Sequence, residues 1–181
     1  MHAPFLTGER VYLRAVTYDD VDRFVAWLND QEVNRYLERQ FPLNAIRERE
    51  WVESQYKSRD AVSLALVLKE EDRPIGVVGL DDIDPIHRNA EFGIFIGDKA
   101  SWDKGYGTEA ARLMVRYGFD TLNLERISLR VFDYNTRAIR AYEKVGFRKE
   151  GVLRRDHFSE GAYHDTVIMG ILREERKDQN T

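Results

Sequence analysis

The apolar residues of this chain change their spacing many times, and the order of those changes is the feature that most limits the fold. Alternating apolar residues predict strands, and spacings of three and four predict helices. The expected strands span residues 11–14, 62–68, 74–82, 90–97, 126–132, 152–155 and 166–172, and the expected helices span residues 17–28, 32–37, 44–59, 108–121 and 136–145. This order predicts an α/β (α+β) fold in which a mixed, mostly antiparallel central sheet is flanked by helices, and it argues against a repeating parallel α/β barrel.

Short-range signals mark several of these elements. Thr17 followed by Asp20 resembles a capping box, and Asn44 is a good helix cap. Gly146 fits the left-handed end of the helix over 136–145. In the helix over 44–59 the candidate buried positions are Ile46, Trp51 and Val52, and in the strand over 62–68 one face carries Leu64, Leu66 and Leu68.

Length and composition limit the class of protein. The 181 residues, 43% of them hydrophobic, predict one domain over residues 1–181 with a frayed polar tail over 173–181. The absence of cysteine excludes disulfides and a thiol nucleophile, and the net charge of −4 disfavours a nucleic-acid partner. No apolar run approaches the length of a membrane span, so we expect no membrane partner. With no cysteine and no export signal, we expect a cytoplasmic location.

The most informative segment is Trp102-Asp103-Lys104-Gly105-Tyr106-Gly107-Thr108, which follows an expected strand and begins an expected helix. Glycines let successive N–H groups turn inward, and the helix N-terminus adds partial positive charge. Together these features predict a phosphate site, with Lys104 adding charge at its rim and Thr108 a hydroxyl.

Other interpretations of this loop are weaker. The full P-loop pattern is absent. Gly105, Gly107 and Ala110 satisfy a dinucleotide-binding fingerprint, but the acid that should follow, Glu125, precedes the next strand instead of ending it. The chain beyond Ala110 is also short for further βαβ units. A tight turn without a ligand is the remaining alternative.

A second informative segment runs from Asn135 to Phe147. Asn135 is placed to cap the helix over 136–145, and Tyr142 lies two turns later on the same face. A phenol in a dry cleft can donate a proton to a leaving group. The alternative is that Tyr142 only packs, with its hydroxyl bonded to the backbone.

Taken together, the two segments resemble the GNAT N-acetyltransferase superfamily, from about Glu9 to Arg173. The resemblance is greatest to the branch that holds the RimJ/RimL-type ribosomal-protein and the spermidine-type acetyltransferases. Further matching segments are Val11-Tyr12-Leu13-Arg14, Asn89-Ala90-Glu91-Phe92-Gly93-Ile94 and Gly161-Ala162-Tyr163-His164-Asp165. One departure is Trp102, which stands where the family pattern often has Gln or Arg.

The resemblance implies a GNAT-like sheet that binds acetyl-CoA across two splayed central strands. It implies that Tyr142 points toward the coenzyme sulfur and protonates the departing thiolate, and that Asn135 contacts the coenzyme. The main chain of Ile94, Phe95 and Ile96 would meet the pantetheine arm. The diphosphate would lie in a cradle formed by Asp103, Lys104, Gly105, Tyr106, Gly107 and Thr108.

The general base is less closely specified. Glu91 lies on the strand before the loop, where some relatives carry a basic carboxylate, but it could equally be a structural partner for an arginine. Asp133 and Glu32 are weaker candidates, and ordered water alone suffices in some family members.

The histidines suggest no metal site. Asp156-His157 and His164-Asp165 lie on two expected strands around a turn at Ser159-Glu160-Gly161, which favours pairing of the two histidines across the strands. We therefore expect acetyl-CoA as the co-substrate and no metal.

The sequence thus predicts an acetyl-CoA-dependent N-acetyltransferase acting on a primary amine, either of a small molecule or at a protein N-terminus. A polyamine acetyltransferase is one alternative. Acidic residues near the first helices could attract a polycation, and these are Glu32, Glu38, Glu48 and Glu50. They alternate with the arginines Arg35, Arg39, Arg47 and Arg49, which would oppose a polycation. The other alternative is a non-catalytic CoA-binding sensor, which the presence of Tyr142 disfavours. Analogy with the family suggests a homodimer.

Overall fold

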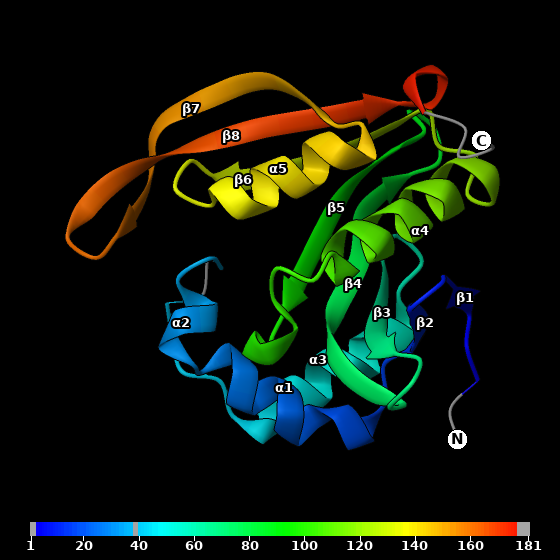
Figure 1. Ribbon diagram of the computed structural model, residues 1–181, viewed down its shortest axis with the longest axis vertical. Helices are drawn as coiled ribbons and strands as arrows, with labels where there is room; N and C mark the ends of the chain where they lie inside the picture. Colours follow the sequence, from blue (N-terminus) through cyan, green and yellow to red (C-terminus); the bar gives the residue numbers. More distant parts are fainter. Residues whose placement is uncertain (1–2, 38–39, 177–181) are drawn as a thin grey trace.

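A single twisted sheet organises the computed structural model, which describes residues 3–37 and 40–176 (Figure 1). The strand order is β1-β2-β3-β4-β5-β6-β8-β7, and every neighbouring pair is antiparallel except β5 and β6, which are parallel. This arrangement confirms the predicted mixed, mostly antiparallel fold. The strands are β1 (Leu6–Thr7), β2 (Val11–Ala15), β3 (Val62–Leu68), β4 (Arg73–Asp84), β5 (Asn89–Ile96), β6 (Arg126–Phe132), β7 (Arg148–Ser159) and β8 (Ala162–Leu172).

Helices cover both faces of the sheet. Leu64, Leu66 and Leu68 point into a large cluster with α4 and α5, while Ala65 and Val67 point into a smaller cluster with α1 and α3. Because both faces of β3 are buried, its apolar run is nearly continuous. The helices are α1 (Val21–Leu28), α2 (Gln31–Asn34), α3 (Ala45–Lys57), α4 (Tyr106–Asp120) and α5 (Thr136–Val145), with short 3₁₀ turns η1 (Tyr18–Asp20), η2 (Lys99–Ser101) and η3 (Arg173–Glu175).

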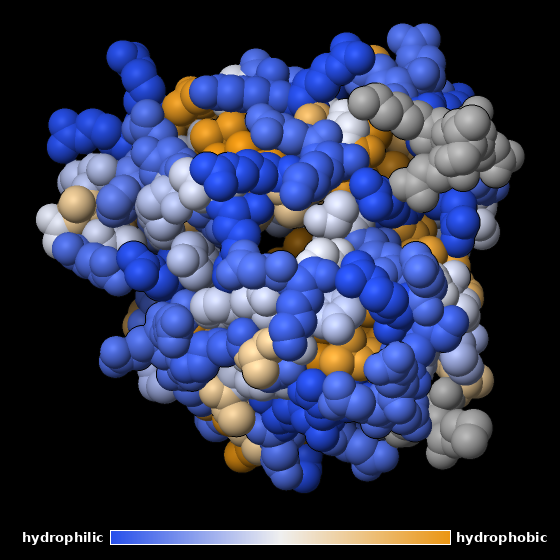
Figure 2. Space-filling view, in the orientation of Figure 1, coloured by the Kyte–Doolittle hydropathy of each residue, from blue (hydrophilic) through white to orange (hydrophobic). Residues whose placement is uncertain are grey.

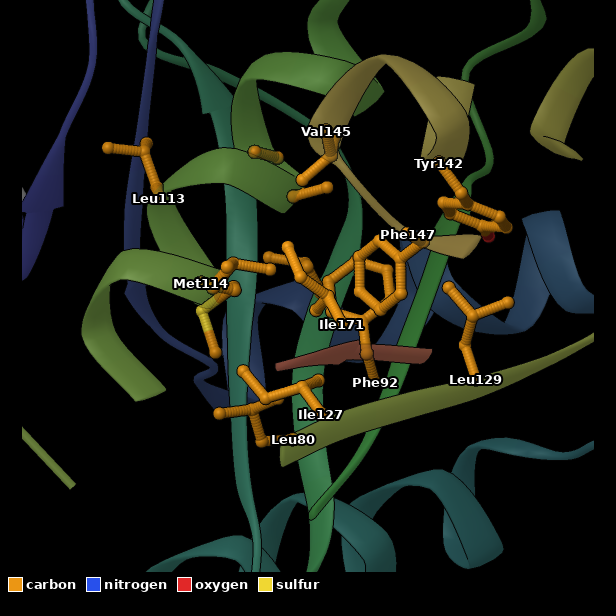
Figure 3. Close-up of a cluster of buried hydrophobic side chains, with 14 of the residues drawn as sticks. Leu80, Phe92, Leu113, Met114, Ile127, Leu129, Tyr142, Val145, Phe147 and Ile171 are labelled. Atoms are coloured by element: carbon orange, nitrogen blue, oxygen red, sulfur yellow. The ribbon is translucent and has the colours of Figure 1, made fainter. Parts of the chain in front are cut away.

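The larger cluster anchors the two helices that flank the site. Figure 3 shows Met114 of α4 and Val145 of α5 meeting side chains of the sheet such as Leu80, Phe92 and Ile127. Met114 and Ile127 are fully buried, so α4 is held rigidly against β4, β5 and β6.

The two central strands separate partway along their length. β5 and β6 pair only from Asn89 to Glu91 with Arg126 to Ser128. Beyond Glu91, β5 stays paired with β4, and beyond Ser128, β6 stays paired with β8. The strands therefore diverge into a wedge, which leaves one edge of β5 without a strand partner.

Local capping signals agree with the structure. The Thr17–Asp20 box is present, although it begins the 3₁₀ turn η1 before α1. The Asn44 side chain accepts hydrogen bonds from the backbone N–H groups of Ile46 and Arg47, which confirms it as the cap of α3. Gly146 ends α5 with φ +117°, as predicted.

Several expected boundaries and positions are wrong. Ile46 is 70% exposed, because it follows the cap on the outer side of α3, whereas Val52 is fully buried as expected. The strand expected at 152–155 extends over all of β7, because pairing with β8 carries it past a poorly patterned, exposed sequence. Helix α2 is shorter than expected and α4 begins two residues earlier, at Tyr106.

The C-terminal tail is partly anchored instead of frayed from residue 173. The backbone N–H of Arg173 donates to the Glu125 carbonyl at 2.9 Å, and η3 follows. Residues 177–181, like Glu38 and Arg39, lie outside the described residues. Among the helices that the structure describes, none has the length and apolar character needed to cross a membrane.

Candidate active site

A cleft of about 610 Å³ opens where β5 and β6 diverge. Figure 2 shows the surface hollowed near its centre, between α5 and β5. Most of the residues singled out from the sequence line it, namely Glu91, Ile94, Phe95, Ile96, Asp103, Gly105, Gly107, Thr108, Asn135 and Tyr142.

Two of the expected loop residues do not line the cleft. The backbone carbonyl of Lys104 accepts a hydrogen bond from Arg10 Nη1 at 2.9 Å, and the ring of Tyr106 lies 5.0 Å from the Arg10 guanidinium carbon. Arg10 also pairs with Glu109, at 3.1 Å between Nε and Oε2. Arg10 therefore fastens the outer side of the loop to β2 and α4.

The glycine loop has the backbone geometry of an anion cradle. Gly105, the residue before α4, has φ +82°, and Asp103 has φ +58°. Since no side chain caps α4, the N–H groups of its first turn are available to a ligand. A Cβ on Gly107 would lie 3.3 Å from Ile96 Cδ1, so a larger residue would crowd the β5 side of the cleft.

The start of α5 faces the same cleft. Asn135 Oδ1 accepts a hydrogen bond from the Ala138 backbone N–H at 3.3 Å, which confirms Asn135 as the cap. Asn135 and Thr136 line the cleft together with Gly105 and Thr108 of the loop. The positive ends of two helix dipoles thus converge on one mouth, which favours an anionic ligand there.

Tyr142 lies at the inner end of the cleft, on α5. Its ring is 9% exposed and contacts Phe92 and Phe147 edge to face, with centroids 5.9 and 6.0 Å apart (Figure 3). Burial raises the pKa of the phenol to about 12, so the hydroxyl keeps its proton at neutral pH. Within the described part of the chain, no hydrogen bond to the Tyr142 hydroxyl is found, which argues against the alternative of a backbone-bonded packing residue.

Glu91 approaches the opening from the other face of the sheet. On β5, Ala90 and Phe92 belong to the large cluster under α4 and α5, whereas Phe95 packs against the smaller cluster under α1 and α3. By alternation Glu91 shares the face of Phe95. The phenol and the carboxylate therefore flank the strand opening from opposite sides.

The weaker base candidates lie outside the cleft lining. Glu32 pairs with Lys99 at 3.0 Å, and Asp133 Oδ1 lies 3.8 Å from His164 Nδ1. His157 pairs with His164 across β7 and β8, as expected, and stacks on Phe132 with centroids 3.8 Å apart. No group of three or more His, Cys, Asp or Glu that could hold a metal is found among residues 3–37 and 40–176.

Sequence reasoning missed one wall of the cleft. Near α2 the wall consists of Val33, Tyr36 and Leu37, and on β6 it includes Arg130 and Phe132. Alternation in β6 places Arg130 and Phe132 on the face opposite the buried Ile127 and Leu129, and this alternation was the available signal. The position of Tyr36 depends on the packing of α2 and had no local signal.

Comparison with known proteins gives consistent results. The family model described as an acetyltransferase (GNAT) domain matches residues 10–148. An uncharacterized N-acetyltransferase of the SPbeta prophage, from Bacillus subtilis strain 168, is 31% identical over 176 residues, covering 97% of each chain. A spermidine N(1)-acetyltransferase of Escherichia coli K12 is 34% identical over 79% of this chain and 82% of its own.

Solved structures show the same likeness. The spermidine N-acetyltransferase of Vibrio cholerae, in complex with CoA and spermine, superposes with a TM-score of 0.86 at 27% identity, covering 93% of this chain and 98% of that one. A GNAT-family acetyltransferase from Bacillus anthracis superposes with a TM-score of 0.81 at 25% identity, covering 94% and 99%.

Proposed function

The chain belongs to the GNAT acetyltransferase family and is an N-acetyltransferase, and from this premise we propose how the cleft between β5 and β6 transfers an acetyl group from acetyl-CoA to an amine. The observation that carries the proposal is the position of Tyr142 and Glu91 on opposite sides of one strand opening.

The residues of the cleft fit the coenzyme. The edge of β5 that diverges from β6 leaves the backbone groups of Ile94 and the N–H of Ile96 for a pantetheine arm, which would lie like an added strand. The Ile96 carbonyl already accepts a hydrogen bond from the Trp102 indole. The amides at the start of α4 fit a diphosphate, and Asn135 lies beside them. Acetyl-CoA supplies the activated thioester.

The two flanking groups divide the proton transfers. The amine nitrogen attacks the thioester carbonyl from the Glu91 side, and the Glu91 carboxylate accepts the amine proton, directly or through a water. As the carbon–sulfur bond breaks, the Tyr142 hydroxyl gives its proton to the sulfur. Because the pKa of Tyr142 is about 12, that proton is present throughout the physiological range.

The lining favours an acceptor with a single amine and an apolar neighbour. The acidic side chains lining the cleft are Glu91 and Asp103, whereas the basic ones are Arg130, Arg137, Arg140 and Lys144. Asp30 and Glu32, the acids near its mouth, both pair with Lys99. Val33, Tyr36 and Phe132 suit an apolar group, and a lining whose acids are Glu91 and Asp103 offers a polycation few counter-charges.

A polyamine is the second candidate acceptor, because the proteins similar to this chain include spermidine acetyltransferases. A thiol-release assay with acetyl-CoA and a panel of N-terminal peptides, amino acids, aminoglycosides and spermidine separates the two. We expect the highest kcat/KM for an apolar monoamine or peptide N-terminus. A preference for spermidine would overturn this acceptor class, and coenzyme binding without thiol release would instead favour the sensor alternative.

Tyr142→Phe tests the acid. Loss of the hydroxyl should lower kcat by about 10²- to 10⁴-fold, the usual range for general acid catalysis. The KM for acetyl-CoA should change little, because the ring still fills its place between Phe92 and Phe147. Steady-state kinetics with the best amine provide the measurement, and an unchanged kcat would remove Tyr142 from the mechanism.

We also propose that residues 1–181 act as one domain, because the one sheet runs from Leu6 to Leu172. The homodimer suggested by family analogy stays a prediction, which light scattering on the purified protein tests.

A further inference from the structure

Arg137 occupies an unusual position at the mouth of the cleft. Its guanidinium carbon lies 4.2 Å from the centroid of the Trp102 ring and 5.5 Å from that of Tyr36. Both aromatic residues line the cleft with it, and their own rings meet edge to face at 6.3 Å. The cation is therefore held between two aromatic walls that come from distant parts of the chain.

Trp102 is itself fixed in place. Its indole N–H donates a hydrogen bond to the Ile96 carbonyl at 2.7 Å, at the end of β5. An indole held by its N–H presents a rigid face, and a guanidinium stacked on that face loses little freedom when it binds a further partner. The stack therefore directs a pre-organised cation toward the loop between β5 and α4.

The electrostatic surroundings of Arg137 call for an anion. Arg137 is the second residue of α5, where the helix dipole makes a cation unfavourable. The anionic partner found for it among the described residues is Asp103, with 3.7 Å between Nη1 and Oδ2, and the Asp103 side chain is 74% exposed. A weak contact of this kind leaves most guanidinium donors available.

The expected rim cation does not meet this need. Lys104 does not line the cleft, whereas Arg137 lines it beside Gly105, Gly107 and Thr108. We infer that Arg137, stacked on Trp102, is the side chain that binds the diphosphate of the coenzyme in this protein. This inference rests on the proposed coenzyme site, and it assigns to an arginine of α5 the charge that the loop itself does not supply.

Truncated donors test the assignment. The kcat/KM for acetyl transfer is measured with acetyl-CoA, acetyl-3′-dephospho-CoA and S-acetylpantetheine, and CoA binding is measured by calorimetry. Arg137→Ala should lower kcat/KM for both diphosphate-bearing donors by about 10- to 100-fold, the usual worth of a hydrogen bond to a charged group. The value for S-acetylpantetheine, which has no diphosphate, should not change.

Three further variants separate a phosphate contact from a structural one. Arg116→Ala removes an exposed arginine of α4 that does not line the cleft, and it should alter none of the donors. Arg137→Lys keeps the charge, but an ammonium stacks less well on Trp102 and cannot form the paired hydrogen bonds of a guanidinium. It should therefore recover only part of the kcat/KM that Arg137→Ala loses. Asparagine tolerates the positive φ of residue 103. Asp103→Asn removes the carboxylate that competes with the coenzyme for Arg137, so CoA should bind more tightly.

Some results would overturn the role of Arg137, and a different result would overturn the proposed function. An equal loss for S-acetylpantetheine, or weaker CoA binding by Asp103→Asn, would show that Arg137 only supports the loop and would overturn the inference. A loss confined to acetyl-CoA, sparing the dephospho donor, would place Arg137 at the 3′-phosphate and would also overturn it. If the unaltered protein bound no CoA at all, the proposed function itself would fail, whatever Arg137 does.

Discussion

The chemistry of single residues in this protein depends on which face of the sheet each residue occupies. Glu91 and Phe92 are neighbours in β5, yet Phe92 packs on Tyr142 while Glu91 faces the opposite side. Alternation along a strand therefore places the proposed base, Glu91, and the proposed acid, Tyr142, on either side of one opening. Tyr142 keeps its proton because burial raises its pKa to about 12.

At this scale the base is tested with Glu91→Gln. Amines are mostly protonated at pH 7, so removal of the carboxylate should lower kcat/KM by about 10²-fold or more at that pH, the lower end of the usual range for general base catalysis. The deficit should shrink above pH 9, where free amine is abundant. The pH–rate profile is the measurement, with Glu32→Gln as the control because Glu32 pairs with Lys99 outside the cleft lining. An effect that is the same at every pH would make Glu91 a structural residue.

At the scale of elements, the turn between β5 and α4 carries the proposed coenzyme site. Gly105 needs φ +82°, which an L side chain adopts only with strain. The strain should shift the N–H groups that begin α4, while the packing of α4 through Met114 stays intact. The sequence pattern alone predicted a turn here, because Gly105 and Gly107 stand between an expected strand and an expected helix.

Gly105→Ala should therefore raise the KM for acetyl-CoA several-fold and lower stability by about 1–2 kcal/mol, the cost of a left-handed residue. Gly161→Ala is a matched control, because Gly161 has φ +81° at the β7–β8 turn and nothing within 4 Å of an added Cβ. Kinetics and thermal unfolding of both variants are compared. If the two variants raised KM alike, the loop would have no special part in coenzyme binding.

At the scale of the whole molecule, a buried ion pair ties the N-terminal helices to the sheet. Arg14 of β2 and Asp20 of η1 are 4% and 1% exposed, with 2.7 Å between Nη2 and Oδ1. Burial alone raises the pKa of Asp20, but hydrogen bonds from Arg14 and from the Thr17 backbone N–H outweigh it, and the net pKa lies below its usual value. Stability from this carboxylate is thus present above pH 4 and is lost as the pH falls through the lowered pKa.

Asp20→Asn should lower the free energy of unfolding by about 3–5 kcal/mol at pH 7, because it leaves Arg14 buried without a counter-charge. The loss should narrow below pH 4, where the unaltered protein is losing the same carboxylate. Urea unfolding at pH 7 and at a pH below 4 measures the difference in the free energy of unfolding between the variant and the unaltered protein. Glu53→Gln, which breaks the exposed pair with Lys57, is the control and should have no measurable effect. If Asp20→Asn and Glu53→Gln lowered the free energy of unfolding by the same small amount, the buried pair would not stabilise the protein as proposed.

The sequence by itself determined the features that neighbouring residues encode. The bounds of β6 and α5, the caps at Asn44 and Asn135 and the left-handed Gly146 all follow from local patterns and backbone preferences. The GNAT resemblance rested on two such local segments, the glycine loop and the stretch from Asn135 to Phe147.

Only the tertiary structure decided how distant segments meet. The point where β5 leaves β6, the length of β7 and the exposure of Ile46 depend on pairing and packing that no short window contains. The same holds for Arg10, which reaches across 94 residues to the Lys104 carbonyl, and for Arg137, which lies against Trp102. Local residue preferences favour each strand or helix, but the pairing and packing that set its length and its contacts come from segments far away in the sequence.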